Sequence, residues 1–156
     1  VGESAAGLAE ALPDGGALIG LDLGTKTIGI AVCDAGWRFA SALKTLPRGK
    51  FGRDRDELRK TIEARSVRGI VIGLPRNMDG TEGPRAQASR AYARNLAEAF
   101  GLPVLLWDER WSTQSAEAAM IGLDVSRRKR AERIDAEAAT VILQAAIDAA
   151  TGSPLL

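Results

Sequence analysis

Histidine is absent from the 156-residue sequence, and cysteine occurs only once, at Cys33. The lack of histidine excludes a Ser-His-Asp triad, a Cys-His pair and an HExxH zinc site. The single cysteine excludes an internal disulfide and a CxxC metal site, and it fits a reducing compartment. The chemistry of any active site must therefore be sought among other side chains.

Long apolar stretches are also missing, since none approaches the roughly 18 residues that a membrane span needs. Residues 1–16 lack the basic start and the apolar centre of a secretory signal. We therefore expect a cytoplasmic protein with no membrane partner. A surplus of positive charge is lacking as well, because 21 Lys and Arg residues face 20 Asp and Glu residues. Binding of nucleic acid must then come from local patches and not from bulk charge.

The length fits one domain, which we place at residues 17–150, between a loose N-terminal arm (1–16) and a C-terminal tail (151–156). Hydrophobic patterning predicts strands over Leu18–Leu23, Thr27–Val32, Phe39–Leu46, Gly69–Leu74 and Pro103–Trp107. It predicts helices over Asp54–Val67, Pro84–Phe100, Ser112 or Thr113 to near Gly122, and Ile134–Ala149, with a mobile basic loop over 124–133. An antiparallel three-strand meander followed by alternating helices and strands predicts an α/β fold, with a mixed five-stranded sheet and helices on both faces.

Acidic residues lie at unusual places in this pattern. Asp22 interrupts an apolar strand, on the same face as two glycines that leave room beside its carboxylate. Asp108 and Glu109 end another strand, and only one of them can join Asp22, because neighbouring strand residues point to opposite faces. Asp135 lies in the first turn of the last predicted helix. Each acid alone has a structural explanation in turn hydrogen bonds, helix capping or the helix dipole. Together they form a set that could converge on Mg²⁺ or Mn²⁺ and support phosphodiester cleavage.

Three segments then resemble the signature segments of the YqgF family, in the same order: Gly20–Val32, Gly73–Pro84 and Asp108–Thr113. This family comprises pre-16S ribosomal RNA nucleases that are also described as Holliday-junction-resolvase-like proteins. The resemblance implies an RNase H-like fold and a divalent-metal nuclease. It implies that Asp22, Glu109 and Asp135 are the catalytic, metal-binding acids, with Asp108 as a second-choice acid.

Basic and polar residues near these acids are candidates for substrate binding. Lys26 and Arg110 flank two of the acids and could neutralise a phosphate or pair with the acids. Asn77 lies in a loop after a buried strand, which either contacts substrate or serves only as a turn. A basic run precedes Asp135 and either holds phosphates or remains a solvated loop; it comprises Arg127, Arg128, Lys129 and Arg130.

We therefore expect a metal-dependent endonuclease that acts in 5′-end maturation of precursor 16S rRNA during ribosome biogenesis. One alternative is a Holliday junction resolvase acting on branched DNA, which would need a symmetric dimer to cut two strands. No large apolar patch predicts a strong dimer, so we expect a monomer or a weak homodimer. Another alternative is a non-catalytic module that binds nucleic acid or the transcription or ribosome-assembly machinery.

Overall fold

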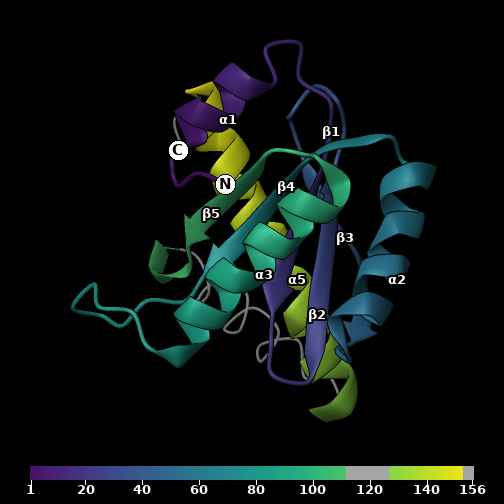
Figure 1. Ribbon diagram of the computed structural model, residues 1–156, viewed down its shortest axis with the longest axis vertical. Helices are drawn as coiled ribbons and strands as arrows, with labels where there is room; N and C mark the ends of the chain where they lie inside the picture. The colour runs from purple at the N-terminus through teal and green to yellow at the C-terminus, as the bar shows by residue number, and fades with distance from the viewer. Residues whose placement is uncertain (112–126, 153–156) are drawn as a thin grey trace.

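The fold is built on one mixed sheet of five strands in the order β3-β2-β1-β4-β5 (Figure 1). The computed structural model describes residues 1–111 and 127–152, with side chains except those of residues 111 and 127–134. The strands are β1 (Ala17–Leu23), β2 (Thr27–Cys33), β3 (Ala40–Pro47), β4 (Val67–Leu74) and β5 (Val104–Asp108). β1, β2 and β3 pair antiparallel, whereas β4 and β5 run parallel to β1. This confirms the predicted meander and the predicted mixed sheet.

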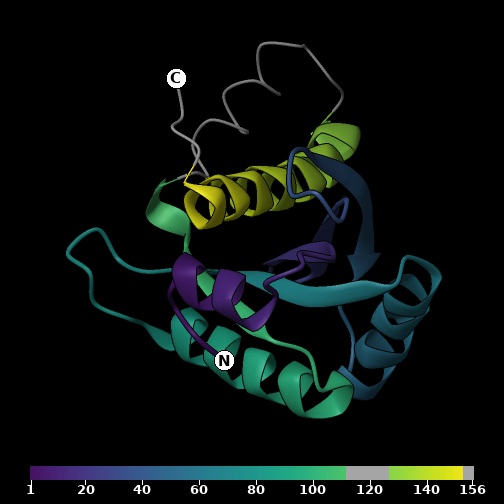
Figure 2. The same ribbon diagram turned by 90° about the horizontal axis from the view of Figure 1, so that it is seen from above.

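Helices cover both faces of the sheet, as the element order predicts. They are α1 (Ala5–Ala11), α2 (Phe51–Ala64), α3 (Pro84–Phe100) and α5 (Arg127–Thr151), and a short 3-10 helix, η1 (Glu109–Trp111), follows β5. Figure 2 shows α5 on one side of the sheet and α3 on the other. Apolar strand residues alternate between two cores: Leu21 and Ile72 pack on the side of α2 and α3, whereas Leu18 and Val71 pack on the side of α1 and α5. No helix in this part of the chain is long and apolar enough to cross a lipid bilayer.

The N-terminal segment is packed, whereas the sequence predicts a loose arm over residues 1–16. The Ser4 hydroxyl caps α1 by accepting a hydrogen bond from the Gly7 N–H at 3.2 Å. Leu8 and Leu12 are buried against the core beneath α5. Gly2 pairs with the outer edge of β5, where its N–H donates to the Val104 carbonyl at 2.9 Å. Leu8 and Leu12 are one helical turn apart, so a single apolar stripe is enough to attach a segment otherwise made of small residues.

The start of the last helix also differs from the prediction. α5 begins at Arg127, so most of the segment expected as a loop over 124–133 is helical. Its Arg and Lys residues are good helix formers. The segment has no apolar stripe, so hydrophobic periodicity does not indicate a helix there. The expected helix between Ser112 and Gly122 lies outside the described residues. α3 has the predicted bounds, since Pro84 occupies its first turn and Gly101 ends it in the left-handed conformation (φ 64°).

Candidate active site

Glycines on the α5 side of the sheet allow the helix to lie directly on the strands. A Cβ atom on Gly29 of β2 would overlap the backbone carbonyl of Asp135, and one on Gly20 of β1 would lie 2.8 Å from the Cβ of Leu143. A Cβ atom on Gly73 of β4 would lie 2.5 Å from the Glu109 carboxyl. Real Cβ atoms do not approach other atoms so closely, so any larger residue would force the helix or the acid away. The three glycines therefore create the space in which acidic side chains from different elements meet.

Asp22 and Glu109 form the centre of this space. Asp22 pairs with Gly29 across the β1–β2 hairpin, so its side chain lies on the α5 face, as strand alternation predicts. Glu109, from η1, shares a hydrogen bond with the Asp22 carboxyl group, which requires one proton between the two groups. Burial raises the pKa of both groups, and burial together with the neighbouring Asp22 raises the pKa of Glu109 to about 8.

Asp135 approaches this pair from α5. Its Oδ2 accepts a hydrogen bond from the Thr27 hydroxyl at 2.5 Å, which fixes the carboxylate beside the start of β2. Its negative charge contributes to the raised pKa of Asp22, after burial. Because α5 begins at Arg127, Asp135 lies two turns inside the helix. The expected first-turn position was wrong, and an interaction with the N-terminal end of the helix dipole does not account for an acid at this depth.

The donor set suits a divalent cation, although its three acids are not equally close. Buried carboxylates that share a proton can exchange it for a cation, and carboxylate oxygens are the ligands that Mg²⁺ and Mn²⁺ prefer. Asp22 and Glu109 are in contact, whereas Thr27 holds Asp135. Among the side chains that the structure describes, no three acids or cysteines are grouped tightly enough to hold one ion together. Joint coordination therefore requires Asp135 to turn from Thr27 towards the pair.

Comparison with known proteins places this arrangement in a family. The profile of the family described as "RuvX: Holliday junction resolvase" matches residues 16–149. The chain belongs to the RuvX family. RuvX relatives named "Putative pre-16S rRNA nuclease" include one from Novosphingobium aromaticivorans, 62% identical over 97% of this chain and 97% of the relative. Another, from Sphingopyxis alaskensis, is 63% identical over 92% of this chain and 93% of the relative.

Solved structures support the RNase H-like fold of this RuvX chain. RuvC of T. thermophilus in complex with a Holliday junction substrate has a TM-score of 0.54 and 16% identity, over 88% of this chain and 97% of RuvC. The yeast mitochondrial Holliday junction resolvase Ydc2 has a TM-score of 0.50 and 13% identity, over 92% of this chain and 84% of Ydc2. At these identities the likeness concerns the fold alone.

In this RuvX chain, Asp108 faces away from the acid pair. Its carboxylate binds the guanidinium of Arg110, with Oδ2 at 2.6 Å from Nη2 and both oxygens at 3.0 Å from Nε. Partial burial acts to raise the pKa of Asp108, but the hydrogen bonds from Arg110 hold it below its ordinary value. Arg110 also donates to the Met78 carbonyl at 3.4 Å, so this ion pair holds the loop after β4. Arg110 is thus paired with an acid, which was one of its two predicted roles.

Arg85 is a basic residue beside the acids that is not among the residues predicted from the sequence. It lies in the first turn of α3 and donates from Nη2 to the Leu23 carbonyl at 3.2 Å. Its positive charge lowers the pKa of both Asp22 and Glu109, against the larger effect of burial. Gly83-Pro84, which predicts a helix start at the sheet edge of the acids, is the signal that could have found it.

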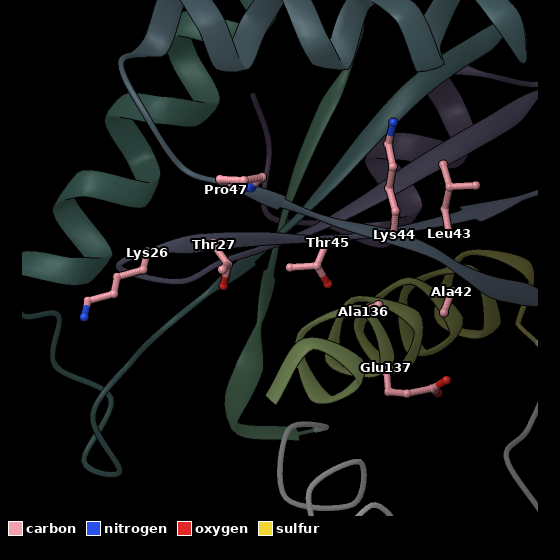
Figure 3. Close-up of a pocket in the computed structure, with 9 residues that line it drawn as sticks. All are labelled: Lys26, Thr27, Ala42, Leu43, Lys44, Thr45, Pro47, Ala136 and Glu137. Atoms are coloured by element: carbon pink, nitrogen blue, oxygen red, sulfur yellow. The ribbon is translucent and has the colours of Figure 1, made fainter. Parts of the chain in front are cut away.

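The other predicted substrate-binding residues come from three separate segments of the chain. Lys26 is exposed and lines a groove of about 600 Å³ between β3 and the N-terminal half of α5. Figure 3 shows Thr27 and Thr45 pointing from the sheet towards α5, from which Glu137 extends. Asn77 lies in the exposed loop and donates to the Thr81 hydroxyl at 2.9 Å, as turn chemistry predicts. The side chains of Arg127, Arg128, Lys129 and Arg130 lie outside the described part of the structure.

Proposed function

We propose that this RuvX protein is a divalent-metal-dependent endonuclease that hydrolyses phosphodiester bonds of precursor 16S rRNA in 5′-end maturation, in the cytoplasm. The observation that carries the proposal is the proton-sharing pair of Asp22 and Glu109, with Asp135 beside it on α5. A module that only binds a polyanion gains nothing from three neighbouring acids, which repel phosphate. The names of the relatives, at about 60% identity, support the RNA substrate.

The three acids would hold Mg²⁺ or Mn²⁺ through their carboxylate oxygens. When bound, such an ion supplies positive charge to the scissile phosphate and activates water. Asp22 and Glu109 must first lose the proton that they share, so binding of the ion is coupled to proton release at these carboxyl oxygens. Thr27 keeps Asp135 at the sheet beside the pair until the carboxylate turns towards the ion, and Arg85 adds a positive charge beside Asp22 and Glu109.

A four-way DNA junction is the second candidate substrate, because the family is described as Holliday junction resolvase and RuvC shares the fold. A resolvase that cuts two strands symmetrically works as a dimer with both sites facing one junction. We rank RNA first, and the same assay compares both substrates.

The test is cleavage of an end-labelled precursor 16S 5′-leader RNA, in parallel with a four-way DNA junction. Each substrate is incubated with Mg²⁺, with Mn²⁺ and with EDTA. The proteins are the wild type, Asp22→Asn and Asp14→Asn, in which the altered aspartate is exposed in the turn before β1. We expect metal-dependent cutting of the RNA that Asp22→Asn abolishes and Asp14→Asn leaves unchanged. Equal cutting by Asp22→Asn, or tight binding without cutting in either metal, would overturn the nuclease proposal in favour of a binding module.

A further inference from the structure

A second pocket lies across the β1–β2 turn from α5, on the side of α3. Its volume is about 300 Å³, and its polar lining includes Thr25, Arg48, Arg85 and Ser89. The two arginines come from different parts of the chain, since Arg48 follows β3 and Arg85 lies in α3. Their presence in one small pocket is a result of the fold, and the sequence spacing does not indicate it.

Both guanidinium groups are held in place by the backbone next to the acids. Arg48 donates from Nη1 to the Gly24 carbonyl at 2.7 Å, and Arg85 donates from Nη2 to the Leu23 carbonyl at 3.2 Å. The Arg48 guanidinium also lies over the ring of Tyr92, with 5.3 Å between Cζ and the ring centroid. Arginines fixed in this way lose little side-chain entropy when they bind a ligand.

Neither arginine forms a salt bridge with a carboxylate among the residues whose side chains the structure describes. A guanidinium has five N–H donors, and the carbonyl contacts above use one donor of each. The remaining donors, together with the N-terminal end of the 17-residue α3 at Pro84, favour an anion in the pocket. Two fixed arginines and a helix start are a donor set that suits the tetrahedral oxygens of phosphate.

The pocket is adjacent to the candidate active site. Leu23 and Gly24, which anchor the two arginines, directly follow Asp22 in the chain. Arg85 is also close enough to Asp22 and Glu109 to interact with their charges. A nucleic-acid strand with one phosphate at the acids can therefore reach the pocket by crossing the β1–β2 turn.

We propose that Arg48 and Arg85 form a binding site for a backbone phosphate next to the scissile bond. Its position relative to the cut rests on the proposed function, whereas phosphate binding itself does not. The site holds the strand in register across the β1–β2 turn, and it recognises the phosphate of RNA or DNA equally. It adds local positive charge to a protein whose formal net charge is only +1.

The first experiment measures binding of labelled single-stranded leader RNA in EDTA, where no cutting occurs, as a function of salt concentration. The variants are Arg48→Gln and Arg85→Gln, with Arg94→Gln as the matched control, because Arg94 is an exposed arginine of the same helix α3. We expect each pocket variant to bind about tenfold more weakly and to reduce the slope of log K against log salt by about 0.7. Arg94→Gln should match the wild type, and Lys variants of the pocket residues should keep the slope because they keep the charge. Unchanged slopes in both Gln variants would overturn the proposal.

The second experiment replaces single phosphates of the RNA by uncharged methylphosphonates, one position at a time. We expect one position, next to the cleavage site, to weaken binding by the wild type but not by Arg48→Gln or Arg85→Gln. Equal losses in wild type and variants at every position would show that the arginines act only on protein structure. If the RNA is never cut but this coupling is found, the phosphate site stands and the nuclease proposal fails. If cutting occurs without the coupling, the nuclease proposal stands and the phosphate site fails.

Discussion

Glu109→Gln should make the metal-free protein more stable at pH 8, although it removes a proposed catalytic group. In the folded wild type, burial beside Asp22 raises the pKa of Glu109 to about 8 from the ordinary 4.5. The folded state therefore retains a proton that the unfolded state has lost over this interval, and stability falls as pH rises from about 4.5 to about 8. Below this interval both states are protonated, so the penalty is absent; above it both are ionised, and the penalty is constant.

The size of the effect follows from the same two pKa values. At about 1.4 kcal/mol per pKa unit, the difference between a pKa of 4.5 and one of about 8 lowers the unfolding free energy of the wild type by at most about 5 kcal/mol. The glutamine side chain introduced by Glu109→Gln carries no charge, and its amide can donate to the Asp22 carboxylate in place of the shared proton. The variant thus avoids this loss of unfolding free energy, and its stability relative to the wild type should increase as pH rises.

Urea unfolding in EDTA at pH 4.5, 6 and 8 tests this expectation, with the change in unfolding free energy as the readout. Glu98→Gln is the control, because Glu98 is an exposed acid of α3. Addition of Mg²⁺ at pH 8 should stabilise the wild type but have less effect on Glu109→Gln, since binding of an ion to the folded state adds to its stability. Parallel pH profiles for the wild type and Glu109→Gln would refute the assignment of a proton-sharing pair.

Three further substitutions test how the site is supported. Gly29→Ala places a methyl group against the Asp135 carbonyl, so we expect thermal denaturation to show a destabilisation of about 1–3 kcal/mol and the variant to lose cleavage. Gly36→Ala, in an exposed turn, is the control and should change neither stability nor cleavage. Leu8→Ala should lower the unfolding free energy by about 2–5 kcal/mol, because Leu8 is buried beneath α5; a loss below about 0.5 kcal/mol would show that α1 is not part of the core. Met78→Ala should leave the melting temperature unchanged, because Met78 is 89% exposed, and should weaken RNA binding in a gel-shift assay; binding equal to the wild type would show that this side chain does not contact substrate.

The predictable parts of the fold are those in which local signals agree with tertiary structure. Within β4, Gly69–Leu74 is a continuous apolar run, so its burial on both faces follows from composition alone. Asp22 stands out because a carboxylate between two leucines on a glycine-lined strand face has no purpose in a core. The choice of Glu109 over Asp108 follows from strand alternation together with the family resemblance, and the structure brings Glu109 to Asp22.

The parts that could not be predicted depend on contacts between distant segments. Gly83-Pro84 could have pointed to Arg85 alone, but nothing in the sequence pairs it with Arg48, and only the β1–β2 turn brings the two together. The N-terminal segment has one leucine in α1, Leu8, and another directly after it, Leu12, among small residues, a signal too short to indicate packing on α5. The first turns of α5 carry charge without an apolar stripe, so periodicity could not locate their start.

The position of Asp135 in the last helix has a consequence for how the protein is made. Synthesis proceeds from the N-terminus at about 5–20 residues per second, so β1 to β5 leave the ribosome before α5 does. Asp22 and Glu109 can then come together in a nascent chain whose α5 face is still bare. Asp135 and Thr27 meet only after α5 has emerged and docked on Gly20 and Gly29. The group of three acids is therefore completed last, when the helix that follows every strand of the sheet docks on a face that the strands have already formed.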